Sequence, residues 1–201
     1  MDNFKKILSY SVFWFIQLTW GIIMNFIGAA TALVLIIAGK KPQTAGPVVY
    51  IKTGHNWGGI TLGAFVFLCE NSNDSILYHE CGHTIQNIYW GPLFPFVIGF
   101  PSLIRCMIRQ RETHLEKSLF NLFLLLITLF ITTILACITG PILPGLKGLT
   151  IFIEVLRLYF LTISIWLGLV EITKYNHGFV DYDEIWFEGQ ASKWGNKIFN
   201  K

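Results

Sequence analysis

The stretch NDSILYHECGHTIQNIYWGP, residues 73–92, decides the fold around the one motif in this chain that indicates chemistry. Asn73 or Asp74 can cap the start of a helix, and Gly91 followed by Pro92 is typical of a helix end. We therefore expect a helix of about four turns here, with the HECGH motif (residues 79–83) near its middle.

Residues four apart project from the same face of a helix, so His79 and His83 can present imidazole nitrogens to one tetrahedral zinc ion. Glu80 follows the first histidine, where its carboxylate can take a proton from a zinc-bound water and deliver it to a leaving amine. The spacing predicts zinc-dependent hydrolysis of an amide bond. The alternative is a pair of hydrogen-bonded core histidines beside a solvated Glu80.

Three other residues of the same helix have structural interpretations. Gly82 allows close packing or a close approach of backbone, and Gln86 continues the ligand face one turn on. Cys81 points away from that face, so we interpret it as a packing residue. The other cysteines, Cys69, Cys106 and Cys137, form no CxxC pair, which indicates free thiols and neither a cysteine zinc site nor a disulfide framework.

Composition places the chain with membrane proteins. It is 53% hydrophobic and 13% charged, with a mean hydropathy of +0.55, against about 25% charged residues in ordinary soluble domains. A net charge of +3 with dispersed basic residues argues against a nucleic-acid partner. We expect one mainly α-helical, membrane-embedded domain over residues 1–201, with the lipid bilayer as its partner.

Seven segments flank the motif helix, three before it and four after it. Residues 10–39 are apolar for longer than the roughly 20 residues that cross a bilayer, so they predict a first transmembrane segment. Residues 40–57 are polar, and the short β-branched run 59–69 predicts a strand, so that residues 40–90 hold the strand and the motif helix. Residues 91–104 are apolar but short and contain three prolines, which favours a re-entrant or interfacial segment.

Segments 118–140 and 149–172 are each long enough to cross the bilayer, and they predict a membrane hairpin. Within the second of them, Glu154 and Arg157 lie three apart, so we expect them to pair with each other and to be buried in the helix bundle. Residues 173–201 are polar and aromatic, which predicts a surface-lying tail.

A catalytic zinc ion usually takes three protein ligands, so one must come from outside the motif. The segment IWFEGQASKWG, residues 185–195, offers Glu188 followed by Ala191 and Ser192. Glu184, with Asp181, Asp183 and His177, is an alternative source. Three side chains could donate to a transition-state oxyanion, and spacing does not choose among them: Tyr175, His177 and Tyr182.

In these segments the chain resembles the gluzincins, especially the membrane metallopeptidases related to the CAAX prenyl endopeptidase and the heat-shock protease HtpX. There HExxH is followed at a distance by a helix bearing ExxAD, whose glutamate binds zinc. The chain is also similar to small bacterial membrane proteins with an HEYGH-type motif followed by GPL. The resemblance implies a small zincin-like helix-and-strand lobe with His79, His83 and Glu188 as zinc ligands and Glu80 as the base. Ser192 stands where the family has aspartate.

Glu188 can join the histidines only if the intervening chain crosses the membrane an even number of times. The hairpin supplies two crossings, which agrees with a re-entrant 91–104 and gives about three transmembrane helices in all. The positive-inside rule then places the site at the cytoplasmic face of the cell membrane. Most basic residues lie on the motif side (Lys40, Lys41, Lys52, Arg105, Arg109, Arg111 and Lys117), against Lys5, Lys6 and Lys147 on the other.

The sequence thus predicts a multi-pass zinc endopeptidase that acts on membrane proteins, peptides or lipidated tails. One alternative is a non-catalytic membrane sensor or accessory protein that retains the gluzincin scaffold, an interpretation that Ser192 favours. A second is a site-2-type intramembrane protease with an aspartate ligand, but the polar turns around the motif helix argue against it.

Overall fold

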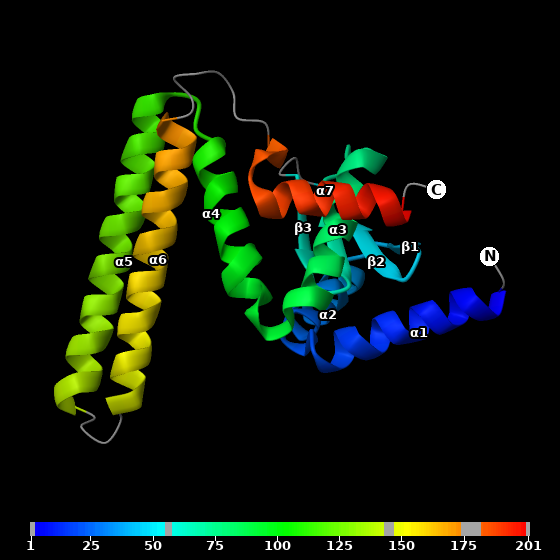
Figure 1. The fold of residues 1–201 in the computed structure, drawn as a ribbon, viewed down its shortest axis with the longest axis horizontal. Coiled ribbons are helices and arrows are strands. Elements are labelled where there is room, and N and C mark those ends of the chain that lie inside the picture. The colour runs from blue at the N-terminus through cyan, green and yellow to red at the C-terminus, as the bar shows by residue number, and fades with distance from the viewer. Residues whose placement is uncertain (1–2, 55–57, 143–146, 174–181, 200–201) are drawn as a thin grey trace. The chain divides into compact units, whose positions relative to one another are not determined.

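The computed structural model describes residues 3–54, 58–142, 147–173 and 182–199 (Figure 1). The chain divides into two compact units: residues Met1–Gly99 with Asp181–Lys201, and residues Phe100–Val180. The first unit contains the motif helix and the strands, and the second contains the long helices of the predicted hairpin.

The motif helix α3 spans Asp74–Trp90, as predicted. The side chain of its N-cap residue, Asn73, accepts a hydrogen bond from the backbone N–H of Ile76 at 3.0 Å, a contact that typically contributes about 1 kcal/mol. Gly91 ends the helix with φ of 51°, a conformation that favours glycine. The two predicted end signals therefore act as expected.

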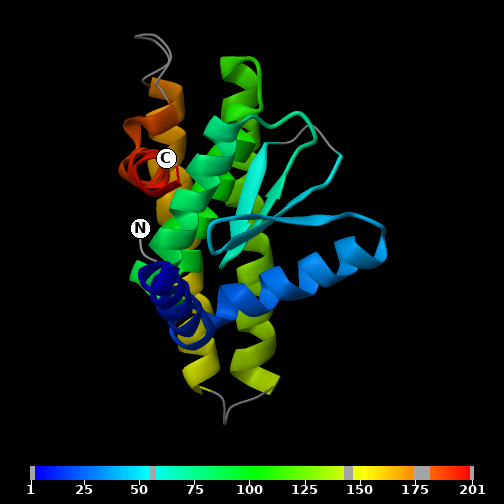
Figure 2. The same cartoon turned by 90° about the vertical axis from the view of Figure 1, so that its right-hand side faces the viewer.

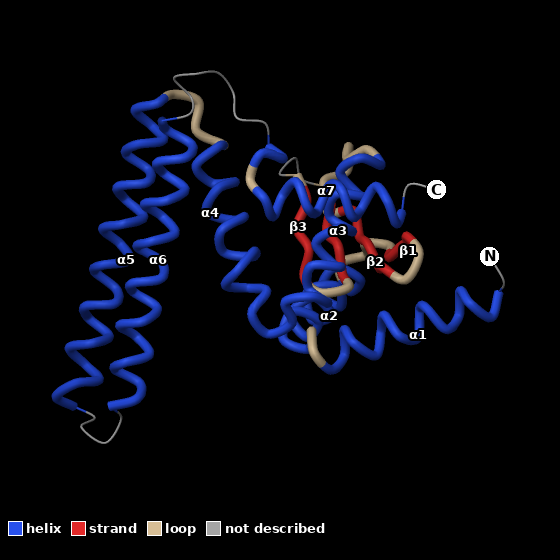
Figure 3. Tube along the Cα trace, in the orientation of Figure 1, coloured by secondary structure: helices blue, strands red, loops and turns tan. Residues whose placement is uncertain are grey.

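A four-stranded sheet lies beside α3 (Figure 3), with strand order β1-β2-β4-β3. The strands are β1 (Pro42–Ala45), β2 (Val48–Lys52), β3 (Gly59–Leu62) and β4 (Phe65–Leu68). The prediction of one strand over 59–69 was wrong, because Gly63 has φ of 70° and turns the chain, so that β3 and β4 pair antiparallel. Strands β1 and β2 lie in the stretch interpreted as merely polar.

The two faces of the sheet are covered by different helices, because side chains alternate along a strand. Val66 and Leu68 pack with Leu77 and Cys81 of α3 on one face. Phe67 and Ile51 pack with Ala32 of α2 (Ile22–Ile37) on the other. Figure 2 shows α3 and α2 beside the strands. The sheet therefore packs against α3 through the buried side chains of that helix.

The predicted continuous segment 10–39 is in fact two helices, α1 (Asn3–Thr19) and α2, which meet at a bend of 99°. The bend is held by buried amides: Asn25 Nδ2 donates to the carbonyl of Gln17 at 2.8 Å, and Asn25 Oδ1 accepts from the N–H of Ala64 at 2.8 Å. Gln17 Nε2 donates to the carbonyl of Thr84 in α3 at 3.0 Å. The polar residues inside this apolar segment thus fix the bend to the sheet and to α3.

After α3 the first unit continues through a 3-10 helix, Gly91–Leu93, and a π-helix, Pro95–Gly99, so the segment expected to be re-entrant is helical throughout. The unit ends with a short 3-10 turn, Tyr182–Glu184, and helix α7, Trp186–Phe199. Although a surface-lying tail was predicted, α7 packs along α3, and Phe187 and Glu188 are fully buried.

The second unit consists of α4 (Phe100–Arg109), α5 (His114–Ile142) and α6 (Lys147–Thr173), and α5 and α6 lie side by side as the predicted hairpin (Figure 1). Arg105 of α4 is fully buried, and its Nε donates to Glu171 Oε1 of α6 at 2.6 Å. The two charges can be buried together because each compensates the other, whereas one alone would be strongly destabilising.

Helices α5 and α6 are long and apolar enough to cross a membrane, and the number of spans rises to four if the bent pairs 5–37 and 74–109 each count as one. This pattern indicates association with a membrane. Glu154 and Arg157 of α6 pair as predicted, but they are not buried within the described residues: their side chains are 40% and 32% exposed.

Candidate metal centre

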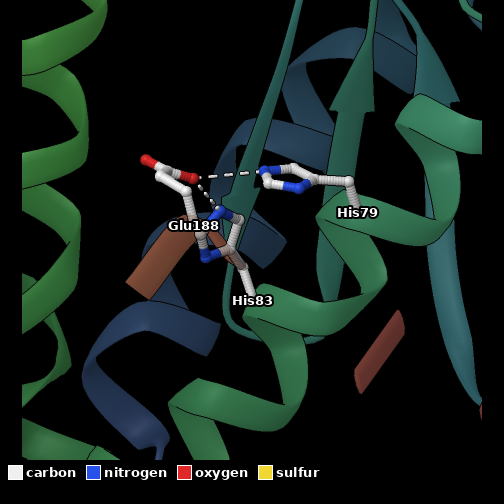
Figure 4. A group of neighbouring side chains, drawn as sticks. All are labelled: His79, His83 and Glu188. Atoms are coloured by element: carbon white, nitrogen blue, oxygen red, sulfur yellow. Dashed lines mark ion pairs between the residues drawn. The ribbon is translucent and has the colours of Figure 1, made fainter. Parts of the chain in front are cut away.

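Three side chains from two helices converge beside the sheet (Figure 4). His79 and His83 project from one face of α3, and Glu188 reaches them from α7. Glu188 Oε2 lies 3.2 Å from Nε2 of each histidine, and the three candidate ligand atoms lie within 4.8 Å of one another. The structure therefore brings together all three predicted ligands, although Glu188 follows His83 by 105 positions in the sequence.

The orientation of His79 is set by two residues of the last segment. His79 Nδ1 lies 2.7 Å from Ser192 Oγ, and Ser192 Oγ donates to Asp183 Oδ1 at 2.8 Å. A hydroxyl has one proton, so Ser192 must accept from His79, and Nδ1 therefore carries the imidazole proton. The lone pair of Nε2 is then directed at Glu188.

A second set of contacts orients His83 in the same sense. His83 Nδ1 lies 2.7 Å from Gln86 Oε1, while Gln86 Nε2 donates to the carbonyl of Phe187 at 2.7 Å and to Gln190 Oε1 at 3.0 Å. Because the amide nitrogen is used in donation, Oε1 accepts from His83. Gln86 is thus a positioning residue, and its side chain also joins α3 to α7.

The result is a concentration of electron-pair donors that suits a cation. Both Nε2 atoms and a carboxylate oxygen point at one place, and within the described residues His79 Nε2 is buried and makes no hydrogen bond. Burial by itself lowers the pKa of His83, but the hydrogen bond and charge of Glu188, with smaller effects of Glu80 and Gln86, raise that pKa to about 9, so that without a metal ion His83 Nε2 carries a proton that faces Glu188. The site thus attracts positive charge, and the group His79, His83 and Glu188 could hold a metal ion.

Glycines bring the two helices close enough for Glu188 to reach the histidines. A Cβ atom at Gly82 of α3 would lie 2.6 Å from the carbonyl carbon of Ala191 in α7, and one at Gly195 would lie 2.6 Å from the carbonyl carbon of Tyr78. Side chains larger than hydrogen do not fit at either place. The predicted close approach at Gly82 is confirmed, and Gly195 is its unpredicted counterpart on α7.

Glu80 is held by strand β3. Thr61 Oγ1 donates to Glu80 Oε2 at 2.7 Å, and a Cβ atom at Gly59 would lie 2.6 Å from Glu80 Oε1, so the carboxyl group occupies the space that this glycine leaves. Glu80 is 7% exposed. Sequence analysis found Glu80 but not Thr61, because no local pattern links a strand threonine to a glutamate 19 residues later.

The other candidates have different places. Asp183 accepts the hydrogen bond of Ser192, and Glu184 is outside the convergent group. Of the three oxyanion candidates, Tyr182 is the one within the described residues. It packs against His79, with 5.5 Å between ring centroids. Cys81 lies in the core, as expected, and burial raises its pKa to about 12. Asp181, His177 and Tyr175 lie outside the described residues.

Comparison of the chain with models of protein families, with curated proteins and with solved structures found no match. The resemblance to gluzincins therefore rests on the motifs and stays a prediction. What the geometry defines is a helix-and-sheet unit with a candidate His–His–Glu metal site, in a chain with long apolar helices.

Proposed function

We propose that this protein is a membrane zinc metallopeptidase that hydrolyses peptide bonds. The observation that carries the proposal is the convergence of His79 Nε2, His83 Nε2 and Glu188 Oε2, in which the glutamate oxygen lies 3.2 Å from each histidine nitrogen. Two imidazoles and one carboxylate, with a fourth position left for water, form the ligand set typical of hydrolytic zinc sites. Bound zinc would lower the pKa of its water to about 7, which makes the water a nucleophile at neutral pH.

Glu80 is the proton carrier in this proposal. It follows His79 directly and is held at 2.7 Å by the Thr61 hydroxyl, so its carboxylate has a fixed position beside the ligands. Glu80 removes the proton of the attacking water and delivers it to the nitrogen of the leaving amine. Tyr182, packed against His79, supplies an O–H group to the oxygen on which negative charge develops.

The sheet favours an extended peptide as the substrate. Among the described strands, β3 pairs with β4 only and is an edge strand, and it carries Thr61, which holds Glu80. An edge strand offers unpaired backbone N–H and C=O groups that bind an extended chain without regard to its side chains. We propose membrane proteins, peptides or lipidated tails as substrates, because α5 and α6 are suited to a bilayer. The positive-inside rule favours a site at the cytoplasmic face of the cell membrane.

The test is to measure zinc content and peptide hydrolysis on detergent-purified protein. Wild type should hold about one zinc per chain, and His83→Ala and Glu188→Ala should lose it. Glu80→Gln should keep the zinc and lose at least about 100-fold in turnover, because only the proton acceptor is removed.

Glu70→Gln is the matched control, since Glu70 is an exposed acid outside the site, and it should behave as wild type. Metal-free wild type, or a Glu80→Gln variant with full turnover, would sink the proposal. Bound zinc without hydrolysis of any peptide in a broad library would favour the non-catalytic scaffold.

A further inference from the structure

An ion pair on the second long helix is the feature of this chain that the proposed function does not use. Glu154 and Arg157 of α6 pair with each other one turn apart, yet 40% and 32% of their side chains are exposed. At 1.5 Å per residue they lie about 10 and 15 Å along the axis from Lys147, where α6 begins. A helix of 27 residues is about 40 Å long and exceeds the roughly 30 Å of hydrocarbon, so both residues fall at membrane depth.

Exposure at that depth calls for a further partner. Ionised side chains inside transmembrane segments almost always face protein or a water-filled cavity, because hydrocarbon solvates no charge. The pair is neutral as a whole, but a guanidinium has five N–H groups and a carboxylate has two acceptor oxygens. One contact between them satisfies only part of this capacity.

The surroundings of the pair have the shape of a helix contact. Glu154 and Arg157 line a groove of about 740 Å³ with side chains of both hairpin helices. Its other walls are mostly apolar, and they include Leu129 of α5 and Ile151, Val155 and Leu158 of α6. An apolar groove with one central polar pair is the pattern of packed membrane helices, in which polar groups bond across the interface.

We propose that this face binds a second copy of the chain, with α6 against α6 about a two-fold axis along the membrane normal. Copies in one membrane share one orientation, so the two α6 helices run parallel and each residue lies at the depth of its own counterpart. Glu154 and Arg157 differ in depth by only about 4.5 Å, which their long side chains can bridge diagonally. A two-fold contact is reciprocal, so Glu154 of each copy then meets Arg157 of the other, in both directions. The four charges form a closed, neutral ring, whereas a partner with a single charge would leave one of the pair uncompensated.

The decisive experiment mixes charge variants of the full-length protein in lipid nanodiscs or native membranes. Glu154→Arg and Arg157→Glu, each carrying a different affinity tag, should self-associate about tenfold less than wild type. Co-expressed, they should pair with each other at near wild-type yield, because every contact across the two-fold is again between opposite charges. The double exchange E154R/R157E should restore self-association, which separates the effect from misfolding.

Cysteine cross-linking locates the face. In a Cys137→Ala background, Leu158→Cys should form a disulfide-linked dimer on oxidation, since Leu158 lines the groove and is 68% exposed. Phe152→Cys is the matched control: Phe152 is 53% exposed but lies nearly opposite Glu154 on the helix, at about 100° per residue, so this variant should form no disulfide-linked dimer.

Zinc content should be unchanged in all of these variants, so this proposal and the proposed function fail independently. Statistical mixing of the two single variants, a monomeric wild type in the bilayer, or equal cross-linking at both cysteine positions would overturn the two-fold contact.

Discussion

Replacing Gly82 by alanine tests whether the close approach of α3 and α7 creates the metal centre. The added Cβ atom would lie 2.6 Å from the carbonyl carbon of Ala191, and ordinary van der Waals contact begins at 3.4 Å. The helices must therefore separate by more than about 0.8 Å (3.4 − 2.6), since the carbonyl oxygen of Ala191 would lie closer still and both atoms belong to the backbone and not to a flexible side chain. Glu188 lies one turn before Ala191 on the same helix, so its carboxylate moves with that backbone.

A displacement of 0.8 Å is large for a metal site, where ligand distances hold to about 0.2 Å. We expect Gly82→Ala to lower zinc affinity by up to about 100-fold, the upper end of what disturbing the groups that orient a metal's ligands typically costs. Helix propensity predicts the opposite sign for stability, because alanine in a helix interior is better than glycine by about 1 kcal/mol. Overpacking, which costs about 1–3 kcal/mol, should offset that gain.

The assay is an equilibrium zinc titration against a competing chelator, with helix content and thermal unfolding followed by circular dichroism. Gly99→Ala is the matched control in the same unit, because a Cβ there would meet its nearest neighbour, the carbonyl oxygen of Phe94, at an ordinary 3.7 Å. If Gly82→Ala bound zinc as tightly as wild type, the idea that glycine contact positions Glu188 would be refuted.

Three further predictions follow from the buried polar groups. Ser192→Ala should lower zinc affinity about 10–100-fold by removing the acceptor of a ligand imidazole proton, and Ser192→Asp should restore it even when combined with Asp183→Asn. Metal-free protein should lose up to about 3 kcal/mol of stability between pH 6.5 and pH 9, because the raised pKa of His83 gives stability that is complete below pH 6.5 and lost above pH 9. The magnitude comes from about 2.5 pH units at 1.36 kcal/mol each. Chemical denaturation at several pH values measures it. Asn25→Leu should destabilise the protein by about 1–3 kcal/mol in thermal unfolding, because it leaves buried backbone groups without partners.

Each of these predictions has an outcome that contradicts it. Equal loss of zinc in Ser192→Ala and Ser192→Asp would mean that packing and not proton acceptance matters there. A metal-free protein whose stability is flat from pH 6.5 to 9 would exclude the pairing of His83 with Glu188. For the bend between α1 and α2, an Asn25→Leu variant as stable as the control Thr31→Val would contradict the prediction, since within the described residues the Thr31 hydroxyl bonds only in its own helix, to the carbonyl of Ile27.

Local signals in the sequence predicted the parts of the fold that local physics decides. The ends of α3 followed from a side-chain cap at Asn73 and a glycine stop at Gly91, both of which act within one turn of the helix. The length of apolar sequence predicted α5 and α6, because a bilayer sets the length that a spanning helix needs. The four-residue spacing of His79 and His83 predicted that both lie on one face, because the period of an α-helix is fixed by its local geometry.

Long-range partners decided what the sequence alone did not reveal. The break in segment 10–39 depends on Asn25 meeting Ala64 across 39 residues, and the parallel pairing of β2 with β4 has no signature in either strand. Likewise, the family resemblance suggested Glu188 and marked Ser192 as a departure from the pattern. Only the folded chain shows Ser192 against His79, 113 residues away, with Asp183 behind it.

The sequence by itself thus determined the motif helix, its two histidines and the apolar lengths, since these depend on neighbours along the chain. The tertiary structure decided how the candidate metal centre is completed. Glycines at positions 82 and 195 let two distant helices approach, and Ser192 of α7, with Asp183 in the turn before it, directs the lone pair of His79 at Glu188. Such contacts are fixed by packing in three dimensions, which no spacing in the sequence records.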